Sequence, residues 1–146
     1  MFFFDTSVVS QVGESDIPVN ALWTFLPIGY LVSILVETPV LVVGLSRKVT
    51  LRQRLLCGVW LTACTYPIVV LVMPMLFSEW QRWQYLLVAE VFAPVAECTL
   101  FWLAFRGNES FNRRDWLDSF VAITIANLAS FGVGEILNYY GWLGLL

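Results

Sequence analysis

Histidine is absent from this chain, and charged residues are few. None of the 146 residues is a histidine, which excludes histidine-ligated haem, zinc or copper, and catalysis by Ser–His or Cys–His pairs, within this chain. No other arrangement of a nucleophile beside a base is present, so we expect no enzyme activity, and we predict no cofactor. Charged residues make up only 13% of the sequence, too small a share for the surface of a soluble domain of this size.

The cysteines form no metal or redox motif. Cys57, Cys64 and Cys98 all fall within apolar stretches, and no two of them form a CxxC pair. Cysteines in such surroundings usually act as small hydrophobic side chains. We therefore expect them to pack as apolar residues rather than to bind a metal or carry out redox chemistry.

Apolar residues, in contrast, are abundant. Hydrophobic residues are 59% of the sequence and aromatic residues 16%, and the mean hydropathy is +0.76. Four apolar stretches each approach or exceed the roughly 20 residues that cross a bilayer; they run approximately from Ala21 to Leu45, Leu55 to Phe77, Gln84 to Phe105 and Trp116 to Leu137. This pattern predicts an all-α membrane protein with four transmembrane helices in a small bundle at residues 21–146, preceded by an extracytoplasmic N-terminal arm at residues 1–20.

The positions of the basic residues predict how the helices are oriented. Only Arg82 lies in the connection between the second and third stretches, whereas the other two connections hold Arg47, Lys48, Arg52, Arg54, Arg106, Arg113 and Arg114. Because cytoplasmic connections carry the excess of Lys and Arg, these two should face the cytoplasm and both termini should lie outside. We expect the bacterial inner membrane as the location. We also expect contact of the first basic connection (Arg47, Lys48, Arg52 and Arg54) with anionic lipids, and no binding of nucleic acid.

Carboxyl groups within the apolar stretches are the main candidates for a functional site. The third stretch contains Glu90 and Glu97, two helical turns apart on one face, with Pro94 between them. An ionised carboxylate at the centre of a bilayer costs at least a few kcal/mol, so this face should meet protein or water rather than lipid. Counting ~1.5 Å per residue from the ends of the stretches places Glu37 at the depth of Glu97, and Glu135 at the depth of Glu90.

The predicted intramembrane polar site therefore has two layers. It comprises Glu37, Glu90, Glu97, Asn127, Ser130 and Glu135. One interpretation is that protonated carboxyl groups bond to neutral neighbours and fix helix contacts; the neighbours considered are Asn127, Thr38, Thr65 and Tyr66. The other interpretation is that the carboxyl groups handle protons or cations.

Two further patterns concern helix packing. Proline lacks a backbone N–H and frees the carbonyl group four residues before it, so kinked spans are predicted at Pro39, Pro67, Pro74 and Pro94. In the fourth stretch, small residues recur every four positions and would permit close approach of another helix. This helix-packing ladder consists of Ala122, Ala126, Ser130 and Gly134.

Two functions are consistent with these features. We favour an accessory or structural subunit of a larger membrane complex, whose buried carboxylates fix helix contacts. Its partners would be the lipid bilayer and other membrane-protein subunits or further copies of the chain. The alternative is an oligomeric proton- or cation-coupled small transporter or channel that uses the intramembrane glutamates.

Overall fold

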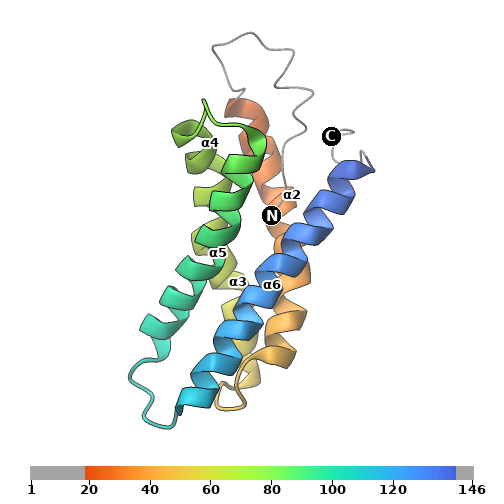
Figure 1. Cartoon of the computed structure of the whole chain (residues 1–146). Helices are drawn as coiled ribbons and strands as arrows, with labels where there is room; N and C mark the ends of the chain where they lie inside the picture. Colours follow the sequence, from red (N-terminus) through yellow and green to blue (C-terminus); the bar gives the residue numbers. More distant parts are fainter. Residues whose placement is uncertain (1–18, 141–146) are drawn as a thin grey trace.

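The computed structural model describes residues 19–140, which form helices and no strand. The elements are α2 (Val19–Gly44), α3 (Leu51–Pro67), the π-helical turn η1 (Ile68–Val72), α4 (Met73–Leu76), α5 (Arg82–Phe105) and α6 (Arg113–Tyr139) (Figure 1). Because α3, η1 and α4 follow one another directly, they form one span, and the described chain has four spans long and apolar enough to cross a membrane. The predicted all-α, four-helix membrane fold is confirmed. The predicted N-terminal arm lies outside the described residues, except for Val19 and Asn20, which belong to α2.

The four spans pack as a bundle in which α2 contacts both α3 and α6, and α5 contacts α6 and α3 (Figure 1). The α2–α3 and α5–α6 connections lie at one end of the bundle, and the α4–α5 connection lies at the other (Figure 1). The two connections rich in Lys and Arg are therefore gathered at one end, which we call the basic end. That this end faces the cytoplasm stays a prediction.

The second span begins before its apolar stretch does. Helix α3 starts at Leu51 rather than at Leu55, because a capping box forms at its first turn. The Thr50 hydroxyl accepts from the Gln53 backbone N–H at 3.4 Å, and the Gln53 side chain accepts from the Thr50 backbone N–H at 2.9 Å. Capping satisfies N–H groups that the first turn leaves free, so the helix extends over polar residues outside the apolar stretch.

Within the second span, every fourth residue from Cys57 to Met73 is buried. A spacing of four exceeds the 3.6 residues of an α-helical turn, so a regular helix would rotate these residues away from the bundle by about 40° per step. The turn η1 opposes this drift, because the Met73 N–H bonds to the Ile68 carbonyl, five residues back, and widens the turn. The buried face therefore continues through the whole span.

Pro74 ends this wide turn and leaves a carbonyl group free. The next bond in the same register would run from residue 74 to the Val69 carbonyl, but proline has no N–H to donate. The Tyr85 hydroxyl of α5 donates to that carbonyl instead, at 2.8 Å. The sequence pattern placed the free carbonyl four residues before Pro74, and the wide turn moves it one residue further back.

Two apolar clusters lie on either side of a layer of buried polar residues. The cluster nearer the basic end comprises Leu41, Leu45, Val49, Cys57, Leu61, Phe101, Ile123 and Ala126. The other comprises Val69, Met73, Ala89 and Ala93. Along their helices, the buried Thr65 and Glu97 occupy positions between the two clusters. The polar layer is therefore sealed by apolar side chains above and below it.

Helix α2 lies very close to its neighbours at two glycines. A Cβ atom at Gly58 of α3 would lie 2.8 Å from Thr38 Cβ, and one at Gly44 would lie 2.7 Å from Ala122 Cβ of α6. Both distances are shorter than packed carbon atoms allow. Only glycine permits these two helix pairs to approach as they do.

Candidate functional site

Glu97 of α5 is enclosed, and both of its carboxyl oxygens accept hydrogen bonds. The residue is 1% exposed. Thr65 Oγ1 of α3 donates to Oε1 at 2.8 Å, and Asn127 Nδ2 of α6 donates to Oε2 at 2.8 Å. Glu97 therefore joins three helices through two neutral donors.

Glu37 of α2 forms the second half of the network. The residue is 4% exposed, and its Oε2 accepts from Thr62 Oγ1 of α3 at 2.6 Å. The Ser130 hydroxyl of α6 lies near the same carboxyl group and also donates to the Ser33 hydroxyl of α2 at 3.2 Å. Together, Glu37 and Glu97 connect all four spans.

Thr62 and Thr65 each present one hydroxyl proton to two acceptors. The Thr62 hydroxyl also lies 2.8 Å from the Gly58 carbonyl oxygen, and the Thr65 hydroxyl lies 3.1 Å from the Leu61 carbonyl oxygen. A hydroxyl group has one proton and two lone pairs. It can therefore donate to a carboxylate, or donate to the backbone carbonyl and accept from a carboxylic acid. The same heavy-atom positions suit the charged and the neutral form of either glutamate.

A small cavity lies between the two carboxyl groups. Its volume is about 20 Å³, which is enough for one water-sized group. Its wall includes Glu37, Glu97, Glu90 and Tyr66. Tyr66 is 4% exposed, and its hydroxyl has no hydrogen-bond partner among the described residues. A buried hydroxyl without a partner is costly, so this cavity combines space for a small group with an unsatisfied polar atom.

Glu90 links this cavity to an open groove between α5 and α6. Glu90 and Pro94 line both spaces, and the groove has a volume of about 610 Å³ with mostly apolar walls. Glu90 is half-buried, and its carboxyl group forms no hydrogen bond with any residue that the structure describes. The charged group that acts on it from α6 is Glu135, which has the same sign. Glu90 is thus an intramembrane carboxyl group at the outer surface of the bundle.

The structure brings most of the predicted polar site together. Glu37, Glu97, Asn127 and Ser130 belong to one network, and Glu90 lies on the wall of the cavity beside it. Glu135 lies near Glu90 rather than in the network. Among residues 19–140, no group of three or more Asp, Glu, Cys or His side chains is arranged to hold a metal ion.

The ladder of small residues on α6 is buried along its length, at Ala122, Ala126, Ser130 and Gly134. It faces α2, because Ala122 meets Gly44 and Ser130 meets Ser33. Both the polar and the apolar contacts between α2 and α6 therefore lie along this ladder of small residues.

Of the four basic residues assigned to lipid contact, Arg47, Lys48 and Arg52 are exposed at the basic end. Arg54 is half-buried. Its guanidinium donates to three backbone carbonyl oxygens, those of Val42 at 2.5 Å, Val49 at 2.9 Å and Ser46 at 3.1 Å. Carbonyl groups at a helix end lack partners within the helix, so Arg54 stabilises the end of α2 as well.

Two members of the polar network were not found from the sequence. Thr62 and Ser33 both join the network, and Thr62 lies three residues from Thr65, on the same helix face. The three-residue spacing of Thr62 and Thr65 was the feature of the sequence that could have identified Thr62. Thr38, an expected partner of the carboxyl groups, packs against Gly58 instead, and its hydroxyl has no hydrogen-bond partner among the described residues.

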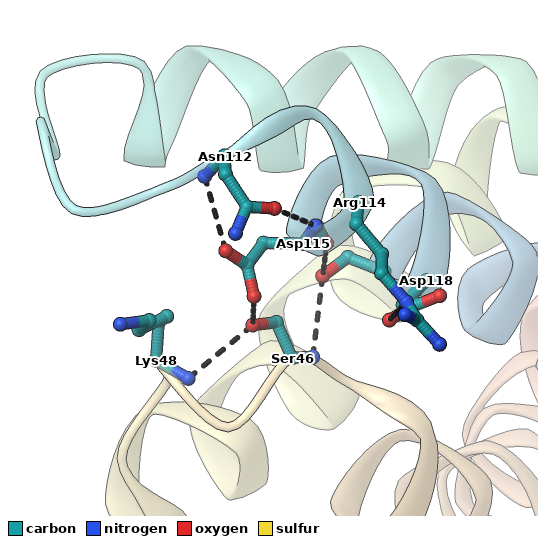
Figure 2. A network of polar contacts seen from close by, with 7 residues as sticks. Ser46, Lys48, Asn112, Arg114, Asp115 and Asp118 are labelled. Carbon is teal, nitrogen blue, oxygen red and sulfur yellow. Dashed lines mark hydrogen bonds and ion pairs between the residues drawn. The ribbon is translucent and has the colours of Figure 1, made fainter.

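A further contact, which the sequence did not indicate, joins the α2–α3 connection to the first turns of α6 (Figure 2). Ser46 Oγ donates to Asp115 Oδ1 at 2.5 Å, and the Ser46 N–H donates to Ser119 Oγ at 3.3 Å. Asp115 Oδ2 accepts from the Asn112 N–H at 3.0 Å, and Asn112 Oδ1 accepts from the Asp115 N–H at 2.9 Å. This second capping box explains why α6 begins at Arg113, three residues before the predicted start.

The fold and the site together define a four-span α-helical membrane protein with a buried carboxyl network across its helices. In comparisons with protein families, with curated proteins and with solved structures, nothing matched this chain. Its function must be argued from the site itself.

Proposed function

We propose that the protein is an accessory subunit of a larger membrane complex, and that a transmembrane helix of another subunit binds in the α5–α6 groove. The observation that supports this proposal most directly is the environment of Glu90. Its carboxyl group lies within a span, lines the open groove and has no hydrogen-bond donor among the described residues. Facing lipid in this way costs a carboxylate a few kcal/mol. A partner that supplies a positive charge or a hydrogen-bond donor would offset that cost.

The walls of the groove define the chemistry of this partner. Beyond Glu90 they are mostly apolar, and the two threonine hydroxyls among them are already bonded within their own helices. Thr99 Oγ1 donates to the Val95 carbonyl at 2.7 Å, and Thr124 Oγ1 donates to the Phe120 carbonyl at 2.9 Å. The complementary partner is an apolar helix with one Lys, Arg, Asn or Gln directed at Glu90.

The buried network supports the same function by fixing the groove. Glu97 ties α5 to α3 and α6, and Glu37 ties α2 to α3. Rigid elements present a binding surface more accurately than mobile ones. The alternative function, a proton- or cation-coupled transporter, draws its support from Thr62 and Thr65, whose hydroxyls suit both protonation states of the glutamates.

Site-specific photocrosslinking in native membranes tests the proposal. A photoreactive phenylalanine in place of Val95 or Thr124 probes the groove, and the same residue in place of Leu35, which is 72% exposed on α2, is the matched control. We expect a crosslink to a different polypeptide from the two groove positions only, and its loss when Glu90→Lys is added. Crosslinks to lipid alone, or only to a second copy of this chain, would contradict the proposal.

A further inference from the structure

We infer that the cavity between Glu37 and Glu97 binds one sodium ion. This inference goes beyond the proposed function and does not depend on it. The cavity is lined by residues of all four spans and has room for one water-sized group, at about 20 Å³. Its polar lining consists of carboxyl, hydroxyl and amide groups from α2, α3, α5 and α6, and their oxygen atoms are the type of ligand that hard cations prefer.

The charges around the cavity favour a monovalent cation. Two carboxyl groups face one small space, and their donors Thr62, Thr65 and Asn127 are neutral. Two carboxylates in such a site cannot both be charged without a positive group. One sodium ion together with one proton gives a neutral site. Divalent cations demand more ligands or retain several waters, for which this volume has no room.

The Tyr66 hydroxyl is an independent indication of a ligand. It is buried, lines the same cavity and has no hydrogen-bond partner among the described residues. Its charge interactions place it near the Glu37 carboxyl group. A phenol oxygen has a lone pair for a cation, and the hydroxyls of Thr62 and Thr65 keep lone pairs while they donate. A bound ion would therefore satisfy an atom that has no partner among the described residues.

The α5–α6 groove provides a route by which the ion enters the cavity. Glu90 and Pro94 line both the cavity and the open α5–α6 groove. A cation that reaches Glu90 from the groove is separated from Glu97 by two turns of the same helix. Among the described residues, the ionisable side chains that line this route are Glu90, Glu37, Glu97, Tyr66 and Cys98, with Glu135 of α6 near Glu90, and none of them is basic.

The test uses the purified full chain in mild detergent, with thermal unfolding followed at constant ionic strength while choline chloride is replaced by sodium chloride. A ligand that binds only the folded state raises the unfolding temperature in a saturable manner. We expect this saturable rise with sodium, and a smaller rise with potassium because the ion is larger. We expect the sodium response to be lost in Glu37→Gln and Glu97→Gln, and to be kept in Glu79→Gln, a control at an exposed residue between α4 and α5.

Tyr66→Phe provides a variant that should fold normally, because it removes an atom that has no partner in the described chain. We expect it to require more sodium for half of the stabilising effect, while its unfolding temperature without sodium is unchanged or higher. Equal effects of sodium, potassium and choline on the wild type would overturn the inference. A response to pH with no response to sodium would overturn it as well, because the site would then hold only a proton.

Discussion

Ser46 Oγ lies 2.5 Å from Asp115 Oδ1, and this hydrogen bond joins the α2–α3 connection to the first turn of α6 (Figure 2). Asp115 uses its other oxygen to cap α6 through the Asn112 N–H. The same carboxylate lies among basic residues, with Lys48 in the neighbouring connection. One side chain thus starts a helix, connects two loops and offsets like charges at the basic end.

Replacing Ser46 should therefore destabilise the fold. We expect Ser46→Ala to lower the free energy of unfolding by about 1 kcal/mol, the usual net value of one hydrogen bond. Asp115→Ala should cost more, because it removes the cap as well. Denaturant unfolding in detergent micelles would measure both. The control is Asp118→Ala, whose exposed side chain lies 4.0 Å from Arg114; a loss there equal to that of Ser46→Ala would contradict this assignment.

Gly58 should not tolerate a side chain. A Cβ atom there would meet Thr38 of α2, so we expect Gly58→Ala to lower the free energy of unfolding by about 1–3 kcal/mol, as overpacked cores do. Gly132→Ala is the matched control, since a Cβ atom there meets nothing within 4 Å. It should raise helix stability by roughly 0.5–1 kcal/mol. Changes of the same sign at both positions would count against the close approach of α2 and α3.

The bond from Tyr85 to the Val69 carbonyl predicts a dependence on Pro74. Tyr85→Phe should leave a buried carbonyl unpaired and cost about 1–3 kcal/mol. Pro74→Ala restores a backbone N–H in the same turn, so the cost of Tyr85→Phe should shrink in that background. A double-mutant cycle of unfolding free energies measures this coupling. Additive effects would show that the two groups do not share the carbonyl.

Glu97→Gln should leave the fold nearly unchanged when sodium is absent. The new amide oxygen can accept from Asn127, and its NH₂ group can donate to the Thr65 hydroxyl, which then donates to the Leu61 carbonyl. Glu97→Leu offers no acceptor to Asn127 and should cost about 1–3 kcal/mol. Thermal unfolding without sodium would compare the two variants. Equal losses would mean that charge, rather than hydrogen bonding, holds the network.

Much of the fold could be predicted because apolar length alone defines a span. The turn η1 could not, because burial at every fourth residue from Cys57 to Met73 becomes visible only once the neighbours are known. The bond between Ser46 and Asp115 joins residues 69 positions apart, and no local pattern connects them.

The candidate site was partly predictable for the same reason. Counting residues from the span ends gave Glu37 and Glu97 a common depth, and the structure places both on one cavity. The depth of a residue along its span does not show in which direction its side chain points around the helix axis, however. Which hydroxyl meets which carboxyl group, as Thr62 meets Glu37, depends on how the helices are turned against each other.

Orientation in the membrane can be tested with single cysteines. After replacement of Cys57, Cys64 and Cys98, Glu109→Cys labels the α5–α6 connection and Glu79→Cys labels the opposite end; both native side chains are exposed. An impermeant thiol reagent added to intact cells should react at position 79 and spare position 109. Labelling of position 109 from outside would reverse the predicted orientation.

The wide turn η1 also holds one residue more than an ordinary turn needs, because its bond from Met73 to Ile68 spans five residues and an α-helical bond spans four. Deleting one residue from Ile68–Val72 would therefore leave an ordinary helical turn, and Met73 would keep its face toward the bundle. Deleting one residue from the regular part of α3 would instead rotate everything beyond it by about 100° and carry Met73 toward lipid. The second span should therefore accept the loss of a residue within the wide turn far better than a loss in the regular helix before it.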